Sequence, residues 1–138
     1  MATPPPVSES ASPALRVLIV DDHADTAESL ALLLRRRGYE TYVASDGARG
    51  LEAAGALRPQ AVLLDLGLPL FDGFEVARRL RAGPDGGGIT LVAVSGRASP
   101  EDEDRSRAAG FDHFLVKPVD FDQLQRALEA CASHSGHL

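Results

Sequence analysis

The sequence predicts an α/β protein in which a parallel sheet is covered by helices on both faces. Four short apolar runs lack polar–apolar alternation, which is typical of strands buried on both sides. They lie at residues 16–20, 61–64, 91–94 and 114–116. A fifth run, residues 39–44, alternates in part and suits an edge strand. Helical patterns follow each run, and this regular alternation favours a parallel sheet with crossover helices.

The segments between the strands show apolar faces with helical spacing. The first carries Ala27, Leu30, Ala31 and Leu34 on one face and closes at Gly38, a residue type favoured just after helix ends. The other expected helices are residues 47–57, the segment of Phe74, Ala77 and Leu80 that Gly83 closes, residues 100–109, and the segment from Phe121 to Cys131 capped by Asp120.

The helix expected at residues 100–109 differs from the others because it contains no large apolar residue. Two ion pairs at i,i+4 spacing, Glu101–Arg105 and Glu103–Arg107, should support it by about a few tenths of a kcal/mol each. We therefore expect a weakly anchored helix, and such helices are candidates to move.

Composition excludes several classes of protein. The 138 residues suffice for one domain, and the formal net charge of −6 disfavours direct binding to nucleic acid. Cys131 is the one cysteine, so no internal disulfide can form, which fits a cytoplasmic location. No apolar run approaches the roughly 20 residues needed to span a membrane. Residues 1–14 and 133–138 are interpreted as tails that flank a domain at 15–132.

Polar residues gather where the predicted strands end. Asp21 and Asp22 follow the first strand, Asp65 the third, Ser95 the fourth and Lys117 the fifth. In parallel sheets of this kind, ligands bind outside the carboxyl ends of the strands. A single polar residue there is ordinary, but three carboxylates, a hydroxyl and an ammonium together favour a functional site.

The chemistry of this set is that of phosphoryl transfer. Three close carboxylates repel one another unless a cation joins them, and hard oxygen ligands select Mg²⁺. A lysine offsets part of the charge when the metal is absent. One carboxylate can then act as a nucleophile towards phosphorus and form an acyl phosphate.

The ordered motifs resemble the receiver domain of bacterial two-component response regulators. They are LIVDDH at residues 18–23, LLDLGLPLFDG within residues 63–73, VAVSG at 92–96 and AAGFDHFLVKP at 108–118. The last of these is most similar to the receivers of hybrid histidine kinases. The resemblance covers residues 15–131 and implies a flavodoxin-like (βα)5 fold with strand order 2-1-3-4-5.

The resemblance also implies roles for the polar residues. Asp65 would be the phosphoacceptor, Asp22 a direct Mg²⁺ ligand and Asp21 a ligand through water. The backbone carbonyl of Gly67 would complete the protein ligands. Lys117 would pair with a phosphoryl oxygen.

A second set of implied roles concerns switching. Ser95 would hydrogen-bond the phosphoryl group, and Phe114 would turn inward once Ser95 moves. Lys117 and Pro118 should be joined by a cis peptide bond that aims the lysine back at the pocket. The switch should alter the surface made by residues 100–109, Phe114 and the last helix.

The resulting functional prediction is a signalling domain, not an enzyme acting on other molecules, which catalyses only its own phosphorylation and dephosphorylation. Its partners would be a histidine kinase or histidine phosphotransfer protein and an unknown downstream protein, with no direct contact to nucleic acid or membrane. A phosphohydrolase with an aspartyl-phosphate intermediate is an alternative, although Gly67 replaces the second acid that such enzymes use. A receiver fold used only as a scaffold is another. His23 could ligate a metal or simply begin a helix.

Overall fold

The computed structural model describes residues 15–68, 72–84, 86–97 and 99–135, with side chains up to residue 130. The predicted amino-terminal tail and the last three residues lie outside this range, as does the side chain of Cys131. The domain limits at residues 15 and 132 stay predictions, and the last helix continues to Ser135.

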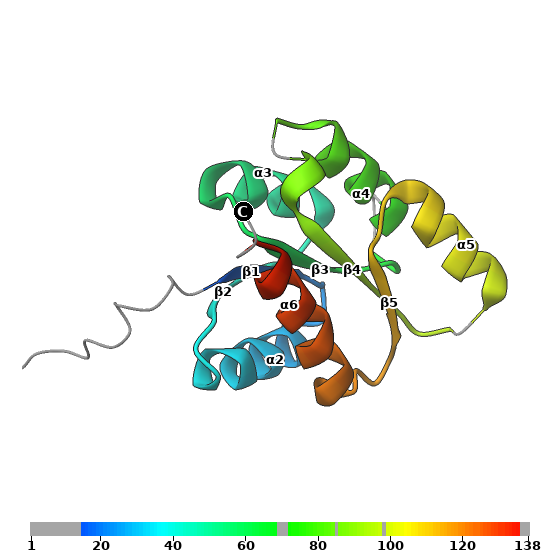
Figure 1. Cartoon of the computed structure of the whole chain (residues 1–138). Helices are drawn as coiled ribbons and strands as arrows, with labels where there is room; N and C mark the ends of the chain where they lie inside the picture. Colours follow the sequence, from blue (N-terminus) through cyan, green and yellow to red (C-terminus); the bar gives the residue numbers. More distant parts are fainter. Residues whose placement is uncertain (1–14, 69–71, 85, 98, 136–138) are drawn as a thin grey trace, which may run out of the picture.

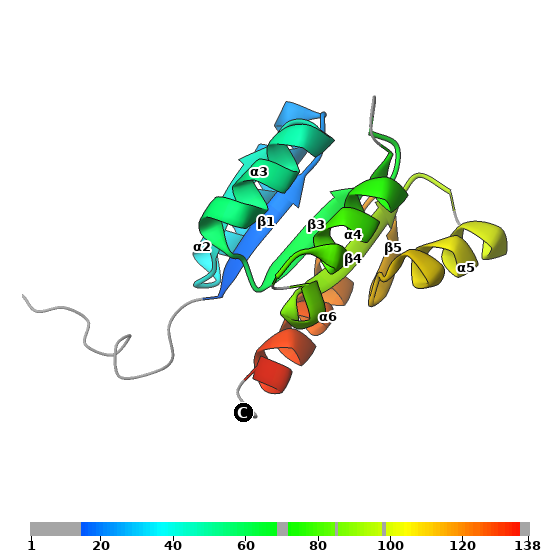
Figure 2. The ribbon, with the colours of Figure 1, turned by 90° about the horizontal axis from the view of Figure 1, so that it is seen from above.

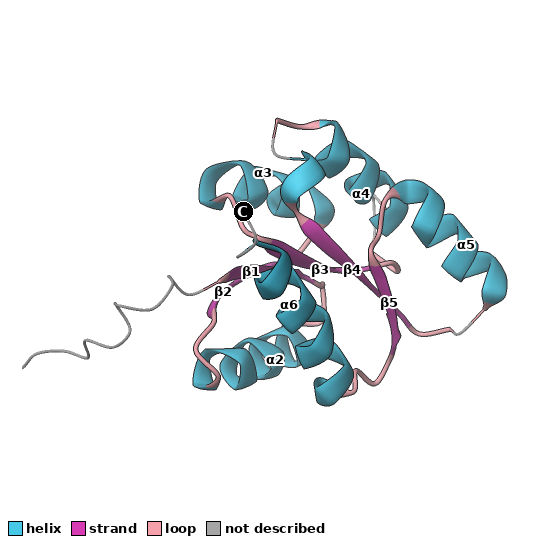
Figure 3. Cartoon of the chain, viewed as in Figure 1, coloured by secondary structure: helices cyan, strands magenta, loops and turns pink. Residues whose placement is uncertain are grey.

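Five parallel strands form one sheet in the order β2-β1-β3-β4-β5, as predicted (Figures 1 and 3). The strands are β1 (Arg16–Val20), β2 (Glu40–Ala44), β3 (Ala61–Asp65), β4 (Thr90–Ser95) and β5 (His113–Val116). β3 is buried along its whole length, whereas β2 lies at an edge, which confirms the interpretation of the partly alternating run. Because the pairing matches Asp65 with Val94 and Ser95 with Val116, the strands end together along one edge.

Helices cover both faces of the sheet (Figure 2). They are α2 (Ala24–Arg36), α3 (Gly47–Leu57), α4 (Gly73–Ala82), the short 3₁₀ turn Gly86–Gly88, α5 (Pro100–Ala109) and α6 (Phe121–Ser135). The apolar faces of α2 and α6 pack on one side of the sheet and those of α3, α4 and α5 on the other. Burial of these faces supplies the main stabilisation, because the helices are too short to be stable alone.

α5 is attached mainly through its last turn. Its buried residues are Ser106 and Ala109. The prediction of i,i+4 ion pairs from Arg105 and Arg107 in this described helix is wrong. The Arg105 guanidinium lies 4.1 Å from the centre of the Phe74 ring, and Arg107 pairs with Asp104 at 3.5 Å. A partly desolvated aromatic face competes well with an exposed carboxylate for an arginine.

Arg81, near the end of α4, holds the carboxyl end of α5 in place. Its guanidinium donates to the Gly110 carbonyl at 2.6 and 2.9 Å and to the Ile89 carbonyl at 2.6 Å. It also pairs with Asp112 at 2.9 Å, and the same carboxylate oxygen accepts the Leu91 amide. We call this set the Arg81 clasp. It leaves the amino-terminal turns of α5 as the less constrained end.

Candidate functional site

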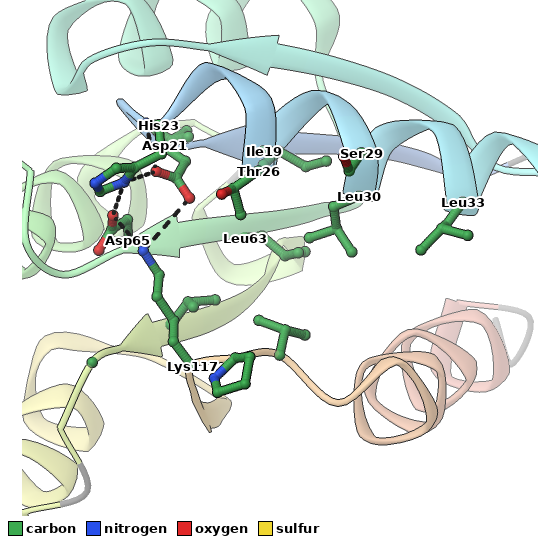
Figure 4. Close-up of a pocket in the computed structure, with 15 residues that line it drawn as sticks. Ile19, Asp21, His23, Thr26, Ser29, Leu30, Leu33, Leu63, Asp65 and Lys117 are labelled. Atoms are coloured by element: carbon green, nitrogen blue, oxygen red, sulfur yellow. Dashed lines mark hydrogen bonds and ion pairs between the residues drawn. The ribbon is translucent and has the colours of Figure 1, made fainter.

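The carboxyl edge of the sheet brings together the polar residues expected there. Asp21 follows β1 directly, Asp65 is the last residue of β3, and Lys117 follows β5. Asp21, Asp22, His23 and Asp65 each place one possible metal-ligand atom within 4.8 Å of the others. Figure 4 shows Asp21, His23, Asp65 and Lys117 converging on this point. The structure thus brings together the three carboxylates and the Lys117 ammonium that were expected at this edge, and the His23 ring joins them.

Asp65 lies at the base of the cluster with only 6 % of its side chain exposed. The Lys117 ammonium is 3.1 Å from one carboxylate oxygen, and the Gly67 amide donates to the other at 2.9 Å. Lys117 also approaches Asp21 at 3.7 Å. Held from two sides, the Asp65 carboxylate has one orientation, which is what a nucleophile or metal ligand requires.

Lys117 is turned towards this pocket by the backbone after β5. The bond between Lys117 and Pro118 is cis, which confirms the prediction made from the family resemblance. The Lys117 amide donates to the Ser95 carbonyl at 2.8 Å, continuing the ladder between β4 and β5 beyond the last paired residues.

Ser95 is buried at the end of β4, but its hydroxyl faces its own loop. The Oγ atom accepts the Arg97 amide and donates to the Arg97 carbonyl, both at 3.1 Å. Phe114, on the neighbouring β5, is half-buried and packs against the core beneath α3, α4 and α5. The two predicted switch residues therefore lie on adjacent strands, and the Ser95 hydroxyl has hydrogen bonds that it can exchange.

His23, which the sequence allowed either to ligate a metal or to begin a helix, is the N-cap residue of α2 and also lies beside the carboxylates. Its ring nitrogen Nδ1 is 2.9 Å from Asp21, 3.3 Å from Asp22 and 3.8 Å from Asp65. The hydrogen bond that the His23 ring donates to Asp21, together with the charges of Asp22 and Asp21, raises the pKa of His23, while Lys117 opposes this rise. In the sequence, only its position directly after Asp21 and Asp22 indicated that His23 could lie at the site.

We expect NMR titration of the metal-free protein to give a His23 pKa above 6.5, the ordinary value. Replacing Asp21 by asparagine should lower that pKa, because the hydrogen bond to a charged acceptor is lost. Because the pKa of His23 is higher in the folded state than in the unfolded state, protonation of His23 stabilises the fold. This contribution to the free energy of unfolding is fully present below pH 6.5 and is lost as the pH rises through the folded-state pKa. A wild-type pKa at or below 6.5 would contradict the geometry.

The donor set suits a hard divalent cation. Asp21, Asp22 and Asp65 supply carboxylate oxygens, and Lys117 neutralises only part of their charge. The space beside Gly67 is open: a Cβ atom added there would meet only the Asp65 carboxylate, at an ordinary contact distance of 3.5 Å. These residues can therefore hold a metal ion whose other positions are taken by water or substrate oxygens.

A groove of about 750 Å³ runs from the carboxylates along α2 (Figure 4). Its apolar lining includes Leu30 and Leu33 of α2 together with Pro118 and Val119. Leu33 is 44 % exposed. The groove places an apolar surface immediately beside the charged pocket.

Comparison with known proteins agrees with this fold. Residues 17–129 match the family model described as response regulator receiver domain. The chain therefore belongs to the receiver domain family of two-component response regulators, which are signalling domains. No helix within the described residues is long and apolar enough to cross a membrane.

Individual relatives give the same result. The transcriptional regulatory protein PrrA of Mycobacterium tuberculosis is 37% identical over 121 residues, which are 88% of this chain and 51% of that protein. The DNA-binding response regulator MtrA of the same organism is 40% identical over 103 residues, 75% of this chain and 44% of that protein. The chain spans about half the length of these curated relatives. The chemotaxis response regulator CheY4 of Vibrio cholerae superposes with a TM-score of 0.81 at 27% identity, covering 86% of this chain and 98% of that one.

Proposed function

We propose that this receiver domain is phosphorylated on Asp65 with the help of Mg²⁺. The observation that carries the proposal is the position of Asp65, which is buried at the base of a carboxylate cluster and oriented by Lys117 and the Gly67 amide. Asp21, Asp22, Asp65 and the Gly67 carbonyl would hold the ion. When bound, Mg²⁺ neutralises phosphoryl oxygens as charge develops on them.

The protein's own groups account for the rest of the reaction. A carboxylate oxygen of Asp65 attacks the phosphorus of a phosphohistidine, the new O–P bond forms, and the P–N bond breaks. The departing imidazole keeps the electron pair of that bond and takes up a proton. Lys117, 3.1 Å from Asp65, faces the transferred oxygens, and Ser95 exchanges its bonds to Arg97 for one to the phosphoryl group. Hydrolysis of the acyl phosphate resets the domain.

The proposed phosphodonor is a histidine kinase or histidine phosphotransfer protein. Its apolar surface would cover the groove lined by Leu30, Leu33 and Val119, which brings the phosphohistidine to the neighbouring carboxylates. A resident phosphohydrolase activity is disfavoured, because Gly67 offers no acid–base side chain beside Asp65. We also propose a cytoplasmic domain without direct DNA contact, consistent with its net charge of −6.

The metal requirement can be tested directly. Incubation with acetyl phosphate and Mg²⁺ should add one phosphoryl mass to the intact protein, and EDTA should abolish that gain. Asp22→Asn should reduce labelling at limiting Mg²⁺ and recover part of it at high Mg²⁺, since one ligand charge is lost. Intact-protein mass spectrometry measures all three. Equal labelling with and without EDTA would exclude the metal role.

Phosphorylation should change the face made by α5, Phe114 and α6. When Ser95 leaves Arg97, Phe114 can turn into the space behind it, and α5 buries too little apolar surface to resist. Hydrogen exchange with and without beryllofluoride should show the largest change in the first turns of α5 and a small change at Gly110, which the Arg81 clasp holds. A response centred on α2 (Ala24–Arg36) would refute this output face.

A further inference from the structure

We propose that His23 is a further ligand of the metal pocket and that it determines metal selectivity, allowing a transition-metal dication such as Co²⁺ or Zn²⁺ to compete with Mg²⁺. The inference rests on the proposed metal-binding function, and goes beyond it by assigning a nitrogen ligand to a site otherwise made of oxygen. Imidazole suits zinc, cobalt and nickel, whereas Mg²⁺ prefers carboxylate, carbonyl and water oxygens.

The distances around His23 fit one shared ion. Ligand atoms about 2.0–2.2 Å from the same metal lie at most about 4.4 Å apart. The Nδ1 atom lies 2.9, 3.3 and 3.8 Å from oxygens of Asp21, Asp22 and Asp65, so all three separations are within this limit. A small shift of each side chain would place these four atoms around a single centre.

The imidazole is oriented by its hydrogen bond to Asp21, whose Oδ1 lies 2.9 Å from Nδ1, and not by a role in the helix or the core. His23 is the N-cap residue of α2, yet its side chain makes no capping hydrogen bond to the helix. The ring does not pack in the core either, because 61 % of the side chain is exposed. The backbone amide of His23 donates to Asp21 at 2.9 Å, and this contact keeps residue 23 beside the carboxylates. The ring therefore stands at the pocket's open rim with a nitrogen turned inward (Figure 4).

Ligation through His23 has a consequence for signalling. A transition metal that binds both His23 and the Asp65 oxygen facing it would fill, with the imidazole, a coordination position that Mg²⁺ leaves to water or a phosphoryl oxygen. Mg²⁺, held by oxygens alone, would leave the imidazole free. The same pocket would thus be phosphorylated with Mg²⁺ and inhibited by a metal that binds nitrogen.

The test measures binding, with Co²⁺ and Mg²⁺ as probes, on the full chain. His134 and His137 are first changed to alanine so that they cannot contribute. In this background His23→Ala should weaken Co²⁺ binding by about tenfold or more, remove the imidazole contribution to the visible Co²⁺ spectrum, and change Mg²⁺ affinity by less than about threefold. His113→Ala, at the half-buried histidine of β5, is the matched control and should bind both ions like the parent.

Two results would overturn the inference: unchanged Co²⁺ affinity in His23→Ala, or equal losses for Co²⁺ and Mg²⁺. Circular dichroism of each variant establishes that the fold is kept. If His23→Ala is still phosphorylated on Asp65 with Mg²⁺ while Co²⁺ selectivity is unchanged, this inference alone fails. If Asp65 takes no phosphoryl group in the parent protein with Mg²⁺, the proposed function itself fails.

Discussion

Asp65→Asn should abolish phosphorylation by acetyl phosphate and leave the fold intact. An asparagine amide has nearly the shape of the carboxylate but is a far weaker nucleophile towards phosphorus. The neutral side chain loses its ion pair with Lys117 and at the same time relieves repulsion from Asp21 and Asp22. These changes act in opposite directions, so we expect only a small shift in melting temperature. Intact-protein mass spectrometry and a thermal melt measure the two effects.

Asp72→Asn provides a matched control for this loss. Asp72 caps α4 by accepting the Glu75 amide at 2.9 Å, and asparagine is an equally good cap. The same chemical substitution outside the pocket should therefore leave phosphorylation unchanged. Labelling of Asp65→Asn at the parent level would mean that another residue accepts the phosphoryl group.

Much of the fold could be predicted because its determinants are local in sequence. Buried strands such as β3 appear as uninterrupted apolar runs, and short polar side chains, Asp46, Asp72 and Ser99, cap the helices that follow them. The site followed from the same logic, since parallel strands bring their carboxyl ends to one edge. Asp65 and Lys117, 52 residues apart, meet there within 3.1 Å.

Other features depend on side-chain directions that a sequence pattern does not contain. Spacing alone paired Arg105 with Glu101, but the fold places its guanidinium over the Phe74 ring, 4.1 Å from the ring centre. His23 has the same sequence position whether it faces solvent or carboxylates, and only the turn after β1 decides between them. Arg81 resembles any other arginine on a helix until the loop carbonyls that it binds are brought together by the fold.

The Arg81 clasp leads to the largest expected effect on stability. Arg81→Ala should lower the free energy of unfolding by about 3 kcal/mol, because it removes the shared donor of the Gly110, Gly86 and Ile89 carbonyls and one partner of Asp112. The side chain is 23 % exposed, so water can replace some of these bonds and a larger loss is not expected. Urea denaturation gives the difference directly.

Arg81→Lys and Arg78→Ala define what the clasp contributes. Lysine keeps the charge but cannot donate in the planar fork that reaches several carbonyls, so it should recover only part of the loss. Arg78 lies on the same helix with 56 % of its side chain exposed and pairs with Glu75 at 3.5 Å. Its replacement by alanine should change stability by no more than about 0.5 kcal/mol. If Arg81→Ala were equally neutral, the carbonyls would be satisfied without the guanidinium, and the clasp could not be what holds the Gly110 end of α5 during switching.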